Sequence, residues 1–140
     1  MILQVTAELI NLSTIRRFVE ESALSLSADE RTAYALVHAV DECATNIIEH
    51  GYRGQAGPIE IEIDRAGETL TIELRDHAPP FNPTGVPPPD LTQPLEKREP
   101  GGLGIYLARQ MVDDMRHRAL PDGGNVLTLI KHIQPTPSSS

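Results

Sequence analysis

The sequence is short of basic residues: it has 12 Lys and Arg against 20 Asp and Glu, for a formal net charge of −8 at pH 7. Broad binding to nucleic acid depends on clustered Lys and Arg that neutralise phosphates. We therefore expect no direct binding to nucleic acid. An anionic ligand would have to be held locally, by backbone amides or by a metal ion.

Long apolar runs and paired cysteines are also missing. No apolar stretch approaches the length needed to cross a bilayer, and the amino terminus lacks the basic and then apolar pattern of an export signal. The single cysteine, Cys43, cannot form an internal disulfide, which fits a reducing compartment. We expect a cytoplasmic protein without membrane contact. Cys43 lies inside a helical pattern, so we interpret it as a packing residue rather than a nucleophile.

The chain is long enough for one domain. With 140 residues, of which 39% are hydrophobic, it can bury one substantial core and is short for two. We assign residues 1–133 to this domain. Residues 134–140 are rich in Pro and Ser, and they are predicted to form a disordered tail.

The first third of the chain predicts a strand and two helices. Residues 2–6 form the strand, and the first helix runs to about Leu26. A capping box then predicts the start of the second helix, with Ser27 as the cap and Glu30 three residues later. This helix is expected to stop at Gly51.

The rest of the chain predicts four more strands and one more helix. Apolar and polar residues alternate over 59–64 and 70–75, which is typical of two half-buried strands. Apolar residues keep helical spacing over 105–115, and 116–120 and 126–133 are predicted to form a final hairpin. This order of elements predicts an α+β fold, a two-layer sandwich in which helices cover one face of an antiparallel or mixed sheet.

Prolines crowd the segment between Asp76 and Pro100. Periodic apolar spacing is lost there, and we expect a long loop with a lid at about residues 84–100. Loops of this length in compact domains often form lids or binding segments. A surface insertion without a role is the alternative. Before Pro100, the prolines stand at positions 79, 80, 83, 87, 88, 89 and 94.

Glu42 and Asn46 stand four residues apart in the second helix, so both side chains lie on one helical face. At about 100° per residue, Glu42 projects roughly opposite the centre of the apolar stripe and Asn46 about 40° from Glu42. Taken alone, the pair is better interpreted as a solvated face. An acid beside a carboxamide oxygen also suits proton handling next to a metal ion. The stripe consists of Ala33, Leu36, Val37, Val40, Ala44, Ile47 and Ile48.

Two further features suit an anionic ligand with an amino group. The glycine-rich stretch 101–104 leads into a helix, where free backbone N–H groups and the helix dipole can bind phosphate. A tight turn without a ligand is equally compatible with these glycines. Asp76 ends a strand, and its carboxylate can accept a hydrogen bond from a ligand amine. Asp is also common in ordinary turns at strand ends.

These three features occur in a fixed order, and together they resemble the Bergerat ATP-binding fold that is shared by gyrase, heat-shock protein 90, histidine kinases and mismatch-repair ATPases. Within that fold, the stretches 41–52, 76–83 and 101–113 are most similar to the anti-sigma-factor serine/threonine kinases. The resemblance covers almost the whole chain up to the tail. Three motifs in register are much more specific than any one of them.

The resemblance implies a function. It implies an ATP-dependent serine/threonine protein kinase that acts as an anti-sigma regulatory factor, phosphorylates an anti-sigma-factor antagonist protein and sequesters a sigma factor. It also implies a homodimer, formed through the first strand and the first helix. ATP and Mg²⁺ are the expected cofactors.

The resemblance also implies roles for single residues. Asn46 would hold the Mg²⁺ ion that bridges the phosphates, and Glu42 would take the proton from the attacking serine or threonine hydroxyl. Asp76 would receive the adenine amino group. The backbone amides of the glycine-rich turn would hold phosphate, namely those around Gly102, Leu103 and Gly104.

One residue departs from the family pattern. The family has Asp-x-Gly at the adenine site, whereas this chain has Ala78 at the third position. A methyl group where the backbone passes close to the base is expected to shift or weaken nucleotide binding. The alternative function is therefore a nucleotide-binding regulatory module that binds partners with little or no kinase activity. In the lid, Lys97 and Arg98 are either a solvated pair or ligands of the γ-phosphate.

Overall fold

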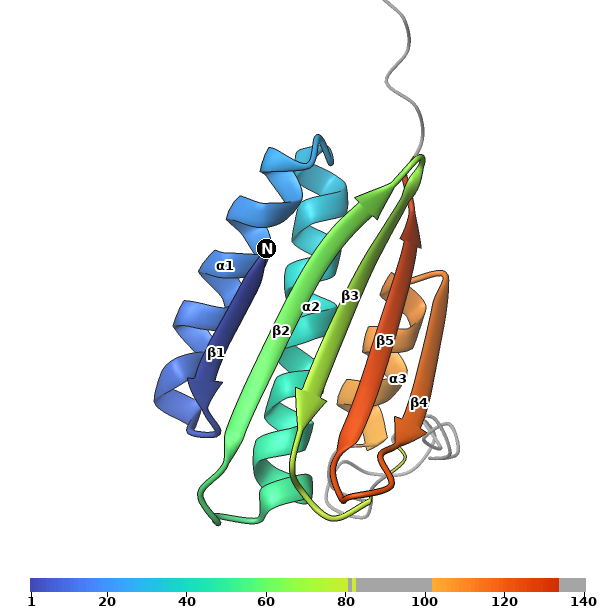
Figure 1. The fold of residues 1–140 in the computed structure, drawn as a ribbon. Helices are drawn as coiled ribbons and strands as arrows, with labels where there is room; N and C mark the ends of the chain where they lie inside the picture. Colours follow the sequence, from blue (N-terminus) through green and yellow to red (C-terminus); the bar gives the residue numbers. More distant parts are fainter. Residues whose placement is uncertain (81, 83–101, 134–140) are drawn as a thin grey trace, which may run out of the picture.

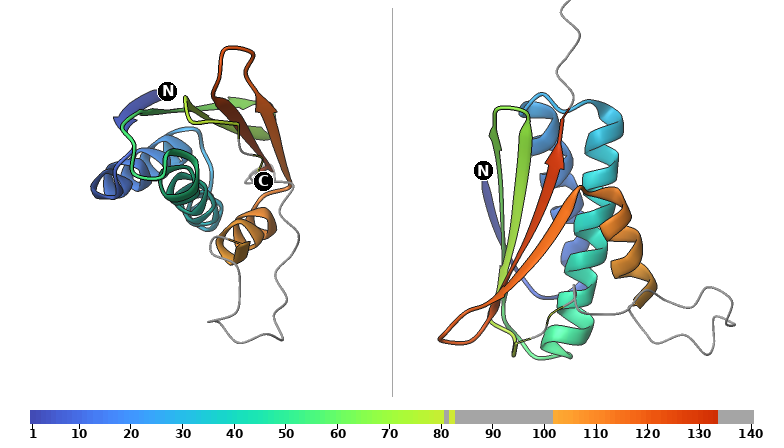
Figure 2. Two further views of the ribbon diagram at one scale, coloured as in Figure 1. Left: turned by 90° about the horizontal axis from the view of Figure 1, so that it is seen from below. Right: turned by 90° about the vertical axis from the view of Figure 1, so that its right-hand side faces the viewer.

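The computed structural model describes residues 1–80, 82 and 102–133 of the chain. Within them, five antiparallel strands form one sheet in the order β1-β2-β3-β5-β4, and three α-helices cover one of its faces (Figures 1 and 2). The predicted two-layer α+β sandwich is confirmed, and the sheet is antiparallel. The strands are β1 (Ile2–Thr6), β2 (Pro58–Ala66), β3 (Thr69–Asp76), β4 (Asp114–Ala119) and β5 (Asn125–His132). The helices are α1 (Leu12–Ser25), α2 (Glu30–Asn46) and α3 (Gly102–Met111), with a 3₁₀ turn η1 (Leu9–Asn11) before α1 and a π-helical segment η2 (Ile47–Tyr52) after α2.

The alternating strands separate an apolar face of the sheet from a polar one. Ile61 of β2 lies opposite Leu74 of β3, and Ile72 of β3 lies opposite Leu129 of β5; all four side chains are fully buried. Each such burial contributes about 1.5–3 kcal/mol relative to exposure. The apolar face therefore binds the helical layer to the sheet.

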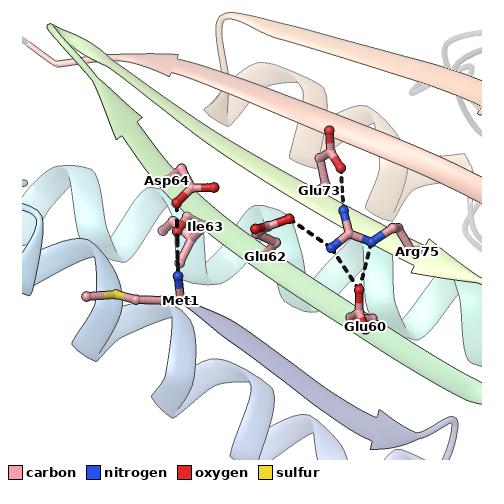
Figure 3. A network of polar contacts seen from close by, with 7 residues as sticks. All are labelled: Met1, Glu60, Glu62, Ile63, Asp64, Glu73 and Arg75. Carbon is pink, nitrogen blue, oxygen red and sulfur yellow. Dashed lines mark hydrogen bonds and ion pairs between the residues drawn. The ribbon is translucent and has the colours of Figure 1, made fainter.

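The opposite face of the sheet carries a charge network around Arg75 (Figure 3). Its Nη2 atom lies 2.8 Å from Glu60 Oε1 and 2.9 Å from Glu62 Oε1, and its Nη1 atom contacts Glu73. The hydrogen bond to Glu62 is the main cause that raises the pKa of Arg75 above its usual range. One cation thus partly neutralises three carboxylates on neighbouring strands.

Helix α2 begins two residues later than the capping box predicts. Asp29, not Ser27, is the cap, and its side chain accepts a hydrogen bond of 2.7 Å from the N–H of Thr32. Ser27 has a φ of 70°, which places it in the left-handed region, and Glu30 is the first helical residue. The prediction chose Ser27, the first of two residues, two positions apart, that can cap a helix.

Gly51 does not stop this helical run, so that prediction was also wrong. The helix widens after Asn46 into η2 and ends only at Arg53, which is left-handed with φ 53° and ψ 46°. Gly54 follows with φ 83°. Gly51 therefore lies inside the last turn. A side chain at this position would point towards Ala78 and Ile47.

Helix α3 ends at Met111, earlier than the apolar spacing over 105–115 predicts, and Met115 belongs to β4. The cause lies in Asp113. Its N–H donates to the carbonyl of Ile130 at 2.8 Å, and its side chain accepts from the N–H of His132 at 2.6 Å. These two bonds join Asp113, two residues after the end of α3, to β5. They hold the chain against the sheet at this point, so the helix ends although the helical spacing of apolar residues continues.

Several predictions fall on residues that the structure does not describe. These are the lid at about 84–100 with Lys97 and Arg98, the first glycine of the glycine-rich turn, and the tail 134–140. Among the described residues, no helix is both long enough and apolar enough to span a membrane.

Candidate functional site

The face of α2 that carries Glu42 and Asn46 is not a solvated face. Helix α3 packs against α2, and Ala39, on the same side as Glu42, is fully buried. Asn46 is only 6% exposed, and Glu42 is half-buried. The interpretation of the pair as a solvated face was therefore wrong. The residues of α2 alone do not show that α3 packs against this face.

Asn46 has a buried oxygen without a partner. Within the part of the chain that the structure describes, no hydrogen bond reaches its Oδ1 atom, which is shielded from solvent. An unsatisfied buried oxygen of this kind costs about 1–3 kcal/mol unless a ligand supplies the missing interaction. The atom lines a small internal cavity together with Cys43, Ile47, Gly51, Asp76, Asn125 and Leu127.

Asp76 contributes a buried carboxylate to the same cavity. It is 3% exposed at the end of β3, and its Oδ1 atom accepts hydrogen bonds of 2.9 Å from the N–H of Ala78 and of 2.9 Å from the side-chain amide of Asn125. Burial raises the pKa of Asp76, while the two hydrogen bonds oppose this rise. Both described bonds go to one oxygen, so the carboxylate keeps capacity to accept a hydrogen bond from a ligand.

Asn125 is a site residue that the sequence analysis missed. Its amide nitrogen lies 3.2 Å from the carbonyl oxygen of Pro79 and 2.9 Å from Asp76 Oδ1, so this end of the amide is the donor. Its Oδ1 must then accept from Nε2 of His117, 2.8 Å away, which assigns the ring proton to Nε2. His117 was placed in the first strand of the final hairpin, and Asn125 lay just before the predicted second strand at 126–133, but no sequence signal showed that this hairpin pairs with β3.

A glycine allows this pairing to come close. Gly124 has a φ of 101°, and a Cβ on it would overlap the carbonyl oxygen of Asp76. Any side chain there would push the turn before β5 away from the end of β3. The position of Asn125 beside Asp76 thus depends on the glycine before it.

Tyr52 is a second residue that was not predicted. It is buried, its hydroxyl donates to the carbonyl of Pro58 at 2.6 Å, and it accepts from the N–H of His77 at 2.8 Å. Burial raises the pKa of Tyr52, so it remains a neutral donor. It ties the end of the long helical run to the segment that follows Asp76.

Glu42 lies against the first turn of α3. A Cβ on Gly104 would overlap the Glu42 carboxylate, so the backbone of the glycine-rich stretch approaches this acid directly. Gly102 and Leu103 form the helical residues that precede it. A carboxylate near a helix amino terminus is favoured by the helix dipole. The structure therefore brings Glu42 to Gly104 and Asn46 to Asp76, about one helical turn apart on one face of α2.

The other two candidates behave as packing residues. Cys43 is fully buried, and this burial raises the pKa of its thiol to about 12, which confirms its interpretation as a packing residue. Ala78 is 1% exposed beside the adenine-site candidate Asp76. Its methyl carbon lies 3.3 Å from the position that a Cβ on Gly51 would occupy.

The arrangement fits a magnesium ion that is held mainly by a ligand's phosphates. Mg²⁺ prefers oxygen ligands and commonly uses one or two from the protein together with phosphates and water. The partnerless Oδ1 of Asn46 supplies one such oxygen. Within the described ranges, no group of three or more His, Cys, Asp or Glu side chains forms a site made by the protein alone.

A comparison with known families agrees with this arrangement. Residues 5–131 match the model of the histidine kinase-like ATPase domain. The chain belongs to this family. Its resemblance to ATP-binding proteins, inferred from three motifs, is thereby confirmed for nearly the whole domain.

Similar proteins narrow the family further. The chain is 32% identical over 100 residues to a serine-protein kinase RsbW of Bacillus mycoides, which covers 69% of this chain and 61% of that protein. It is 27% identical over 119 residues to the serine/threonine-protein kinase BtrW of Bordetella bronchiseptica, covering 84% and 83%. The chain thus matches about three fifths of the length of the RsbW relative.

A solved structure supports the fold. The RsbU and RsbW domains of a Mycobacterium tuberculosis protein superpose on 97% of this chain with a TM-score of 0.62 at 19% identity, and the match covers 34% of that larger chain. Sequence identity at this level supports a shared fold and nothing more. It agrees with the antiparallel sheet and the single helical layer.

Proposed function

We propose that this histidine kinase-like ATPase domain is an ATP-dependent serine/threonine protein kinase and acts as an anti-sigma regulatory factor. Its substrate is an anti-sigma-factor antagonist protein, and it sequesters a sigma factor. The names of the relatives support this proposal. The observation that carries it is the partnerless, buried Asn46 oxygen in the same cavity as the buried Asp76 carboxylate.

In this proposal the two buried groups bind different parts of ATP. Asp76 accepts a hydrogen bond from the adenine amino group, and Asn125 and the N–H of Ala78 orient its carboxylate for this. Asn46 provides an oxygen for Mg²⁺, which neutralises phosphate charge when bound. The backbone amides of the first turn of α3, around Gly102, Leu103 and Gly104, hold phosphate.

Glu42 is the proposed general base. The hydroxyl oxygen of the substrate serine or threonine forms a bond to the γ-phosphorus, the bond from that phosphorus to the β,γ-bridging oxygen breaks, and ADP leaves with the electron pair. Glu42 takes the hydroxyl proton. Its place against Gly104 supports this role, because the phosphate-binding turn and the acid are then adjacent.

The partners and assembly follow from the relatives and from the exposed apolar residues. We propose a cytoplasmic homodimer that contacts its partner copy through β1 and α1. Ile2 is 59% exposed on β1, and Leu9 and Ile10, in the turn before α1, are 52% and 81% exposed. Exposed apolar side chains on these two elements suit a protein interface.

The test is phosphate transfer to a captured partner. Proteins that bind the purified chain from native cell lysate are incubated with it and Mg-ATP, and their intact masses are measured. We expect one partner to gain a phosphoryl group that is stable in acid, with the Glu42→Gln variant at least about 100-fold slower. Glu68→Gln, an exposed acid in the turn between β2 and β3, is the matched control and should match the unaltered chain.

Three outcomes separate the alternatives. Tight Mg-ATP binding without transfer to any captured partner would support the nucleotide-gated binding module instead. Phosphate that is labile in acid would indicate histidine phosphorylation. Equal rates for Glu42→Gln and the unaltered chain would remove Glu42 from the reaction.

A further inference from the structure

The methyl group of Ala78 occupies space that a side chain at position 51 would need. A Cβ built on Gly51 would lie 3.3 Å from the Ala78 methyl carbon, closer than ordinary van der Waals contact. Its next neighbour would be Ile47 at 3.8 Å, which is an ordinary contact. Since Ala78 is only 1% exposed, it has little room to move away.

The backbone does not explain the glycine at position 51. The glycines with positive φ among the described residues are Gly54, Gly67, Gly123 and Gly124, and Gly51 is not one of them. It lies within the π-helical segment η2, where glycine is less favourable than alanine. The reason for glycine at this position is therefore packing: the absence of a side chain leaves room for the methyl group of Ala78.

The position of Ala78 matters for Asp76. The Ala78 N–H donates to Asp76 Oδ1 at 2.9 Å, and the Ala78 carbonyl lies 3.4 Å from the side-chain amide of Asn125. A shift of Ala78 would disturb both bonds, because both atoms belong to its backbone. Gly51 itself lines the cavity that holds the Asp76 carboxylate.

We propose that Gly51 is a positioning residue of the nucleotide site. It accepts the Ala78 methyl, so the backbone of residue 78 keeps its place and presents its N–H to Asp76. This inference rests on the proposed ATP site at Asp76. It replaces the expectation that Ala78 weakens nucleotide binding: the methyl is accommodated, and the sizes of residues 51 and 78 depend on each other.

The test is a double-mutant cycle with Mg-ADP as the probe, measured by isothermal titration calorimetry. Gly51→Ala should weaken Mg-ADP binding about five- to tenfold, because the added methyl group overpacks against Ala78. The exchange variant Gly51→Ala/Ala78→Gly should recover the affinity that Gly51→Ala loses, so that Gly51→Ala has little effect when it is measured against Ala78→Gly as its background. A role in helix stability alone would give no such recovery.

Thermal unfolding of the same four proteins gives a second readout. In the Ala78→Gly background, Gly51→Ala should raise the unfolding temperature, because alanine is the better helix former. In the chain that keeps Ala78, Gly51→Ala should lower the unfolding temperature, because the added methyl group overpacks against Ala78. If Gly51→Ala does not fold, a folded exchange variant that binds Mg-ADP supports the same pairing.

The two proposals fail in different ways. If the unaltered chain does not bind Mg-ADP, the proposed function is overturned and the nucleotide part of this inference falls with it. If the unaltered chain binds and Gly51→Ala has the same effect in both backgrounds, on affinity and on unfolding temperature, the inference alone is overturned.

Discussion

Replacing Asp76 by Asn should stabilise the protein without nucleotide while it removes nucleotide binding. The carboxylate is 3% exposed, and its burial raises its pKa above the ordinary value of 3.8. Asn has nearly the same shape, and its oxygen can still accept the hydrogen bonds from Ala78 and Asn125. What the substitution removes is the cost of burying a charge.

The sign of the effect follows from the direction of the pKa shift. A carboxyl group whose pKa is raised on folding binds its proton more tightly in the folded state, so the folded state loses stability as pH rises from the unfolded pKa through the folded pKa. Each unit by which the pKa is raised corresponds to about 1.4 kcal/mol. Because burial is the larger cause and the two hydrogen bonds only oppose it, we expect Asp76→Asn to have a higher free energy of unfolding than the unaltered chain at pH 7.5. The gain should shrink as pH falls towards the unfolded pKa.

The measurement is urea unfolding at several pH values between 4.5 and 8, without nucleotide. Asp122→Asn, an exposed residue in the turn between β4 and β5, is the matched control and should leave the free energy of unfolding within about 0.5 kcal/mol at every pH. In parallel, calorimetry with Mg-ADP should show at least about a 100-fold loss of affinity for Asp76→Asn, because a neutral amide receives the adenine amino group far less well.

The reasoning would be refuted by an Asp76→Asn protein that is less stable than the unaltered chain at pH 7.5, with a difference that does not depend on pH. That result would mean that the ionised carboxylate stabilises the fold, through its hydrogen bonds, by more than its burial costs. A stable variant that still binds Mg-ADP normally would leave the stability argument intact and contradict the role of Asp76 at the adenine.

Two further predictions concern Asn46 and Arg75. Asn46→Ala should lower the affinity for Mg-ATP at least about tenfold in calorimetry, yet it should not lower the free energy of unfolding by more than about 1 kcal/mol, because its Oδ1 has no partner among the described residues to lose; equal Mg-ATP affinity would contradict its proposed role. Arg75→Met, which keeps an apolar stem and leaves three carboxylates without their cation, should cost about 1–2 kcal/mol in urea unfolding at low salt and less at 0.5 M NaCl. A loss that is independent of salt would point to packing instead of charge.

Local patterns predicted the sheet better than the site. The alternation in β2 and β3 depends on neighbours two residues apart, so it identified both strands. The end of α3 was misplaced because Asp113 bonds to β5, a contact between distant parts of the chain that periodicity does not record. For the same reason the apolar stripe of α2 could not show that a second helix covers its other side.

Site residues were found where they belonged to motifs, and missed where only pairing of distant strands placed them. The motifs pointed to Glu42, Asn46 and Asp76, and the structure brings the last two to one cavity. Asn125 lines this cavity because the register of β3 and β5 places it opposite Asp76. No residue type or spacing near Asn125 indicates that register, so the sequence alone could not assign it.

The antiparallel pairing of β3 with β5 makes the cavity depend on contacts between distant parts of the chain. Asp76 and Asn125 are 49 positions apart, and they meet only when these strands join. The entropy of closing such a loop grows slowly, by about 0.6 kcal/mol for each doubling of its length. Because this cost depends only weakly on length, the separation of 49 positions is a small obstacle to the pairing, and the hydrogen bond between Asp76 and Asn125 forms where the two strands meet.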